Sequence, residues 1–335
     1  MSAENGYLIR EYKRSDADEV VSMLNMEREN PCAVVDSVGN IRLIRYVPIS
    51  SSKVVAEDAA GKIVGYAYLA DKEKSFVFET GGGVHPDHQE SGVGSILLKW
   101  AQDKASALNQ MGPNWIRSVL QVNIFEPDPE MFRLFENEGF SRTREWAHYE
   151  IQLKMVSALD LIEGIKIRPF NLDDDWDLAG PVMDAAFMDH WGAYSLPSVE
   201  STDTFEKDEF GGEENVEDDS YSNADGYCFI AFAEDDVAGG ILCNAKLVEF
   251  KNTGRVGSVF VNPKYRRLGV GRSLMLSAFN AFWRSGVRRV ILDTDSKSFS
   301  DSAKFYTSLG MDIYRREFLY EKEIRSGKEI RRLHR

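Results

Sequence analysis

Residues 255–276 read RVGSVFVNPKYRRLGVGRSLML, and this stretch decides the fold. Its apolar, β-branched run at 256–261 predicts a strand, which an Asn-Pro pair ends. A loop follows in which Arg266, Gly269 and Gly271 have the spacing R-x-x-G-x-G, and a helical pattern comes next. Main-chain N–H groups at such a turn point outward together, so the turn can hold a phosphate or pyrophosphate group. A glycine motif alone is weak evidence, since a tight strand-to-helix turn can also hold nothing.

The same pattern occurs earlier in the chain, which indicates an internal duplication. The matched positions, in chain order, are Ile9 with Ile167, Asp16 with Asp174, Gln89 with Arg266, Gly92 with Gly269, Gly94 with Gly271, and Gly139 with Gly310. Residues 157–164 read as a connector between the copies. The sequence therefore predicts two domains, at residues 1–156 and 165–335.

A third feature is Tyr306, which lies on a predicted helix thirty-five residues after Gly271, in AKFYTSLGM. Strand, V-x-P-x-x-[QR]-x-x-G-x-G, helix, strand and a Tyr-bearing helix form an order that resembles the GNAT acetyltransferases, over nearly the whole chain. The resemblance implies an α/β fold with a mixed sheet, in two tandem GNAT-like domains. It also implies acetyl-CoA as co-substrate and no metal. The tandem layout is similar to that of mycothiol synthase, in which the second domain does the chemistry.

The resemblance also implies which residues bind the co-substrate. Backbone groups of Val259, Phe260 and Val261 would pair with the pantetheine and face the thioester oxygen. The pyrophosphate would lie against the main chain of Arg266, Arg267, Leu268, Gly269, Val270, Gly271, Arg272 and Ser273. A possible second site in the first domain would use Val84, Gln89, Gly92, Val93, Gly94 and Ser95. Glu90 stands there in the place of Arg267, and its carboxylate would repel a pyrophosphate.

Tyr306 matches the family's general acid, which protonates the thiolate as it leaves. The alternative is an aromatic core residue on an amphipathic helix, like the neighbouring Phe305. Phe135 stands at the matching place in the first half, where a phenyl ring packs but cannot give up a proton. The amino-terminal domain is therefore predicted to be silent or much impaired.

The general base is less well defined by the sequence. Glu249, on a predicted strand of the second domain, could accept the amine proton directly or through water. The alternative for Glu249 is a solvated carboxylate at a strand end. Competing candidates are Asp293, Asp295 and His190. Some enzymes that this chain resembles need no dedicated base.

The overall composition and charge limit the classes of partner that the protein can have. The net charge of −14 over 335 residues argues against a nucleic-acid binder, which presents a basic face. Three scattered cysteines without a C-x-x-C pair suggest neither a disulfide framework nor a zinc site, and favour a reducing, cytoplasmic location. No apolar run has the length of a membrane span. Residues 200–219, with ten acidic residues and one lysine, could attract a cationic acceptor or form a solvated loop.

The sequence thus predicts an N-acetyltransferase that moves an acetyl group from acetyl-CoA to a primary amine, by direct attack. A small-molecule amine is the expected acceptor, and the protein is expected to be a monomer or homodimer. The alternative is a non-catalytic protein that binds an acyl-CoA as a sensed ligand or a structural element.

Overall fold

The computed structural model divides the chain into two compact units, each of which is described by itself. The first contains residues 1–144 and 317–329, and the second contains residues 145–316 and 330–335. The described residues are 2–4, 6–26, 33–35, 41–43, 52–73, 75–126, 129–156, 158, 162–187, 226–245, 250, 252–296 and 302–331. Among them, no helix combines the length and the apolar character that crossing a bilayer requires.

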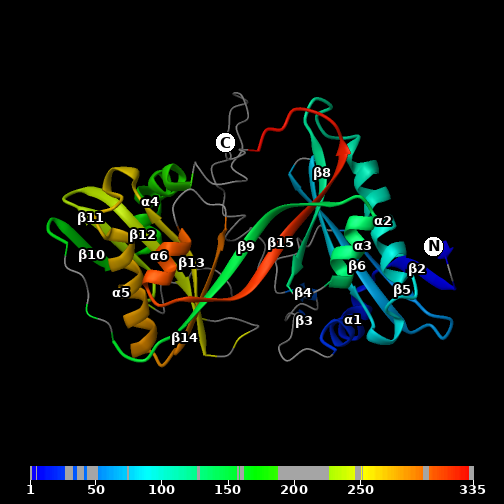
Figure 1. Ribbon diagram of the computed structural model, residues 1–335, viewed down its shortest axis with the longest axis horizontal. Helices are drawn as coiled ribbons and strands as arrows, with labels where there is room; N and C mark the ends of the chain where they lie inside the picture. Colours follow the sequence, from blue (N-terminus) through cyan, green and yellow to red (C-terminus); the bar gives the residue numbers. More distant parts are fainter. Residues whose placement is uncertain are drawn as a thin grey trace. The chain divides into compact units, whose positions relative to one another are not determined.

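The first unit is a sheet covered by helices on both faces (Figure 1). Its strands, in spatial order, are β1 (Ser2–Glu4), β2 (Tyr7–Glu11), β5 (Ser52–Glu57), β6 (Ile63–Glu73), β7 (Val77–Val84), β8 (Ser118–Phe125) and β15 (Asp312–Arg325). Its helices are α1 (Ala17–Leu24), α2 (Val93–Asn109) and α3 (Pro129–Asn137). A separate hairpin joins β3 (Ala33–Val35) and β4 (Ile41–Leu43). Successive strand residues point to opposite faces, so Val54 packs with α2 and Val55 with α1.

The second unit repeats this plan (Figure 1). Its strands, in spatial order, are β9 (Ser141–Gln152), β14 (Arg289–Asp295), β13 (Thr253–Val261), β12 (Asp236–Asn244), β11 (Phe229–Ala233) and β10 (Ile165–Pro169). The helices are α4 (Leu172–Phe187), α5 (Val270–Arg284) and α6 (Ser302–Ser308). One apolar core joins all three helices to the strands. The mixed α/β architecture predicted from the sequence is confirmed.

Each unit receives its last strand from the other half of the chain. β9 follows α3, yet its residues 146–152 pair with β14 in the second unit. β15 follows α6, yet from Glu317 onward it pairs with β8 in the first unit. The predicted ranges 1–156 and 165–335 describe the two copies along the chain and stay a proposal, because the packing units are not continuous in sequence.

An ion pair ties β2 to the turn before α1 in the first unit, and β10 to the first turn of α4 in the second. Arg10 contacts Asp16 at 2.7 Å, and Arg168 contacts Asp175 at 2.6 Å. The match of Asp16 to Asp174 is therefore wrong by one residue. Asp16 lies six residues after Arg10, whereas Asp175 lies seven after Arg168, so the second copy has one more residue between the strand and this turn of the helix.

Two central parallel strands diverge in each unit. In the second unit, β13 and β14 are paired only from Thr253 with Arg289 to Arg255 with Ile291. A bulge against β12 near Gly257 bends β13 just beyond this point. In the first unit, β7 and β8 are paired only at residues 77–79 with 119–121. We call these places the β13–β14 divergence and the β7–β8 divergence, and beyond each of them the two strands are no longer paired with each other.

Candidate functional site

The turn that leads from β13 into α5 has the same backbone as the turn from β7 into α2. The Asn262 side chain accepts a hydrogen bond from the N–H of Lys264 at 3.1 Å, and the His85 side chain accepts one from the N–H of Asp87 at 3.2 Å. Arg267 has a φ of 66° and Glu90 a φ of 59°. The two loops are therefore matching copies of one backbone that differ in their side chains.

A left-handed glycine begins the helix in both copies. Gly269 precedes α5 and Gly92 precedes α2, each with a φ of 90°, which a glycine adopts without steric cost. The first N–H groups of a helix have no acceptor within the helix, and no side chain caps α5. The main-chain bond from Ser273 to Gly269, at 3.0 Å, is the first of the regular helical pattern. The start of α5 therefore offers N–H groups and the positive end of the helix dipole to an anion.

The charges on the two turns are opposite. The second turn carries Lys264, Arg266, Arg267 and Arg272, and the first carries Asp87, Gln89, Glu90 and Ser95 at the matching places. The second turn therefore has four positively charged side chains, and the first has two negatively charged ones among these positions. Lys264 is neutralised by Asp236 at 2.6 Å, which leaves three arginines at the second turn.

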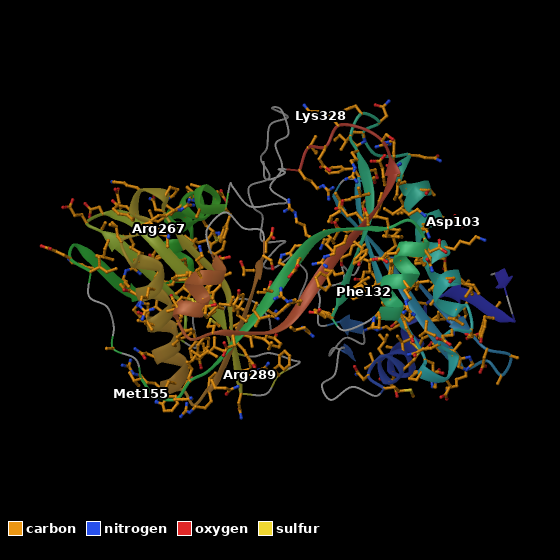
Figure 2. The ribbon with its side chains drawn as sticks, in the orientation of Figure 1. Asp103, Phe132, Met155, Arg267, Arg289 and Lys328 are labelled. Carbon is orange, nitrogen blue, oxygen red and sulfur yellow. The ribbon has the colours of Figure 1, made fainter. Side chains whose placement is uncertain are left out.

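Each of two arginines makes a hydrogen bond to the end of a nearby helix. Arg266 donates to the carbonyl of Ala186 on α4 at 3.1 Å, and Arg272 donates to the carbonyl of Ser308 on α6 at 3.3 Å. Figure 2 shows the exposed Arg267 near one end of α5 and Arg289, at the start of β14, near the other. A diphosphate would be attracted to the second turn and repelled from the first.

Helix α6 lies beside this turn. A Cβ atom placed on Gly271 would lie 3.4 Å from Val261 and 3.5 Å from the Phe305 ring. The first unit has the same arrangement, with Gly94 beside Leu134 at 3.5 Å. The predicted binding residues from Val259 to Ser273 are thus brought together with α6 in one region of the second unit.

Tyr306 is 8% exposed and belongs to the core of the second unit. Its ring lies 5.5 Å from that of Tyr149 and 5.2 Å from that of Phe305, centroid to centroid. Burial raises the pKa of the phenol, and the negative charge of Asp293 raises it further. Within the described residues, its hydroxyl has no hydrogen-bond partner. Tyr306 therefore combines the packing of a core residue with a phenol that stays protonated at neutral pH.

The first unit lacks this phenol. Phe135 is 5% exposed and packs edge-on against Phe140, with ring centroids 5.0 Å apart. Beside the β7–β8 divergence, the Tyr68 ring occupies the place of a side chain at Gly81, since a Cβ there would lie 2.8 Å from that ring. The Tyr68 hydroxyl donates to the buried Glu79 carboxylate at 3.1 Å. The Tyr68 side chain therefore covers Gly81 of β7 in the first unit.

A polar cluster on the sheet of the second unit could not be found from sequence. His148 of β9 is the cross-strand partner of Asp293 on β14. The His148 ring lies 6.1 Å from that of Tyr314 on β15, and Arg289 lies 5.0 Å from the same Tyr314 ring. Strand β9 is far apart in sequence from β14 and β15, and no local pattern indicates their pairing.

Several predicted residues lie outside the described part of the chain. These are Glu249, His190 and the acidic segment 200–219. Asp293 and Asp295 lie at the carboxyl end of β14, as expected. Within the described residues, no group of three or more His, Cys, Asp or Glu side chains could hold a metal ion.

Two models of one acetyltransferase family match the chain. The model for the acetyltransferase (GNAT) family matches residues 192–311, and the model for the acetyltransferase (GNAT) domain matches residues 50–142. A mycothiol acetyltransferase of Nocardiopsis dassonvillei is 23% identical over 340 residues, which cover 92% of this chain and 93% of that protein.

Solved structures share the fold over nearly the whole chain. A GCN5-related N-acetyltransferase from Sphaerobacter thermophilus has a TM-score of 0.75 at 21% identity, covering 98% of this chain and 99% of that chain. A tandem GNAT protein from the clavulanic acid biosynthesis pathway has a TM-score of 0.68 at 18% identity, covering 96% and 100%.

Proposed function

Because the chain belongs to the GNAT acetyltransferase family, with one such domain in each half, we propose that its second unit transfers the acetyl group of acetyl-CoA to a primary amine of a small molecule. The observation that carries this proposal is the contrast between two otherwise matching turns. The second turn has three arginines at a left-handed glycine, whereas the first has Gln89, Glu90 and Ser95 at the matching places.

The donor would bind along β13 and the start of α5. The main chain from Arg266 to Ser273 would hold the pyrophosphate, with N–H groups supplied by the helix start. The backbone of Val259, Phe260 and Val261, beyond the last pair with β14, would hydrogen-bond the pantetheine. An N–H group fixed near the thioester oxygen would stabilise the negative charge that develops there; a single donor of this kind contributes about 2.7–4 kcal/mol in a serine protease.

Tyr306 would act as the general acid. As the C–S bond breaks, its hydroxyl would give a proton to the sulfur, which leaves as a thiol. Burial raises the pKa of the phenol, so the hydroxyl is protonated at neutral pH when the thiolate forms. Burial also excludes water, which would otherwise compete for that proton.

The acceptor would be a small primary amine. Support comes from the relative that covers nearly the whole chain, whose name identifies it as an acetyltransferase of a small molecule. The first unit would bind no diphosphate and would catalyse no transfer, since its turn is acidic and Phe135 replaces the phenol. Glu249 stays a prediction as the base.

The proposal is tested by measuring thiol release from acetyl-CoA with glucosamine, spermidine and lysine as acceptors. We expect turnover with at least one of them, and a kcat about 10²- to 10⁴-fold lower in Tyr306→Phe. Tyr149→Phe, which alters the ring next to Tyr306, is the matched control and should keep most of the activity. Tight CoA binding without thiol release from any acceptor would instead identify an acyl-CoA sensor.

A further inference from the structure

We propose that Asp293 is the general base of this reaction and takes the proton from the acceptor amine. The inference rests on the proposed function, because it assigns the second half of the acid–base pair to a described residue. Asp293 lies on β14 two residues beyond Ile291, where the pairing of β14 with β13 ends. It therefore stands at the edge of the β13–β14 divergence, beside the strand that would carry the acetyl donor.

The carboxylate of Asp293 is accessible. The residue is exposed, although it lies in a strand whose preceding residues, Val290 to Leu292, are buried. Within the described part of the chain, this carboxylate makes no hydrogen bond and no ion pair. A carboxylate that is already committed to a structural bond could not accept a proton without breaking that bond, and no such bond holds Asp293 among the described residues.

The acid and the base would approach the divergence from the two faces of the sheet. Leu292 pairs across the strands with Tyr149, whose ring contacts Tyr306 of α6. Asp293 is the next residue, so it points to the opposite face, where its cross-strand partner is His148. An amine on that face would attack the acetyl carbonyl from the side opposite the phenol.

The negative charge of Asp293 acts on the pKa of two phenols, Tyr306 and Tyr314. The charge of Asp293 raises the pKa of Tyr306 after the larger effect of burial, and it has the same direction of effect on Tyr314. The geometric link between the two residues runs through Leu292, which precedes Asp293 and whose cross-strand partner Tyr149 contacts the Tyr306 ring.

Other charged or titratable groups face Asp293 from the neighbouring strands. Arg289 is bound by Glu150 at 2.6 Å on the same face of the sheet. The remaining groups are His148 on β9, Arg255 on β13, and Tyr314 and Arg315 on β15. Asp295, two residues further along β14 on the same face, is the other carboxylate at this end of the strand, and one of its carboxylate oxygens is buried. Asp293 is exposed whereas Asp295 is half-buried, so Asp293 is the more accessible of the two to a cationic amine.

The proton balance is complete with these two residues. Asp293 takes one proton from the ammonium form of the acceptor and later releases it to solvent. The free amine attacks the acetyl carbon, a C–N bond forms and the C–S bond breaks. Tyr306 gives its proton to the departing sulfur. The attacking nitrogen loses its remaining extra proton to solvent, and the phenolate regains one proton from solvent. The products are an amide, a thiol and one proton.

The test compares Asp293→Asn with Asp295→Asn and Glu249→Gln, using whichever of glucosamine, spermidine and lysine the wild type acetylates. We expect kcat/KM to fall about 10²- to 10⁴-fold in Asp293→Asn and to change less than about threefold in Asp295→Asn. The second readout is hydroxylamine as acceptor, which is largely unprotonated at neutral pH. Asp293→Asn should recover most of its loss with this nucleophile, since no ammonium proton has to be removed.

The outcomes separate the two proposals. If the wild type acetylates none of the three amines, the proposed function fails together with the base. If it turns over and Asp293→Asn is unchanged, or if Asp293→Asn is equally impaired with hydroxylamine, Asp293 is not the base while the acetyltransferase assignment stands. A selective loss in Glu249→Gln would overturn the inference in favour of Glu249. Acetyl-CoA binding and thermal unfolding of each variant show whether it is folded.

Discussion

At the scale of single residues, the Arg–Asp pairs show what fixes the first strand and helix of each unit. Asp175 is 2% exposed and accepts two hydrogen bonds from Arg168, each of 2.6 Å. It also accepts the N–H of Asn171 at 2.7 Å. The bonds from Arg168 outweigh the effect of burial and lower the pKa of Asp175. A charged, fully bonded carboxylate therefore stabilises the fold.

Replacing this carboxylate should destabilise the protein in a pH-dependent way. We expect Asp175→Asn to lower the free energy of unfolding by about 1.5–3 kcal/mol at pH 7, because two charge-assisted bonds are weakened. The folded pKa is below the unfolded value of about 3.9, so this stabilisation is present above about pH 4 and is lost as the pH falls through the folded pKa. Denaturant unfolding of both proteins from about pH 7 to about pH 3 measures the difference, which should shrink below about pH 4.

The neighbouring Asp174 provides the control. It is exposed and bonds only the Asn171 side chain among the described residues. Asp174→Asn should change the stability by less than about 0.5 kcal/mol. A pH-independent loss in Asp175→Asn, or an equal loss in Asp174→Asn, would contradict this account of the ion pair.

At the scale of elements, the two glycine turns show that one backbone can carry opposite charges. The chain path is set by Gly269 and Gly92, and the charge is set by exposed side chains. Binding of a diphosphate can therefore be altered at Arg267 without altering the fold, since Glu90 adopts the same left-handed conformation.

Arg267→Glu should weaken the donor complex. Reversing one charge about 4 Å from a phosphate in water changes the interaction by about 2 kcal/mol, which corresponds to a rise of roughly thirtyfold in the KM for acetyl-CoA. The kcat should change little, because the reacting atoms are untouched. Steady-state kinetics at two salt concentrations provide the measurement, and added salt should reduce the difference. Glu90→Arg, the reciprocal change in the first unit, should leave the kinetics unchanged; an equal effect there would place donor binding in the first unit.

The sequence predicts those parts of the fold that are determined by residues close together in the chain. The turns, the strand before each turn and the helix after it follow from glycine spacing and apolar periodicity within about twenty residues. The contact of Tyr306 with Tyr149 and the cross-strand pairing of Asp293 with His148 could not be predicted, because they depend on α6, β14 and β9 meeting in space. The sequence comparison matched Asp16 with Asp174 instead of Asp175 for another reason. Residues 173–175 are three consecutive aspartates, and nothing in their sequence indicates which carboxylate faces inward.

At the scale of the whole molecule, the exchange of last strands means that neither half of the sequence contains a complete unit. The edge of the first unit's sheet at β8 is covered by residues 317–325, which come from the end of the chain. The edge of the second unit's sheet at β14 is covered by residues 146–152. Cutting the chain at the connector and separating the halves would leave a long strand edge unpaired in each, which favours aggregation.

Arg117 is the residue through which this exchange can be tested. It binds three carboxylates of the carboxy-terminal segment, at 2.8 Å to Glu323, 2.9 Å to Glu329 and 3.4 Å to Glu321. Arg117→Ala should destabilise the first unit by about 1.5–3 kcal/mol. Amide hydrogen exchange measured by mass spectrometry should become faster in residues 118–125 and 317–325, and stay unchanged in β11 and β12.

Arg289→Ala is the matched change in the second unit, because the ion pair of Arg289 with Glu150 joins β14 to β9. Here exchange should become faster in residues 145–152 and 289–295, and stay unchanged in β8. The two variants together distinguish exchanged strands from contiguous domains. If the last strand of each copy stayed with its own half, Arg117→Ala would leave β15 protected, and Arg289→Ala would leave β9 protected. Faster exchange of both strands in the pattern described requires that each unit be completed by the other half of the chain.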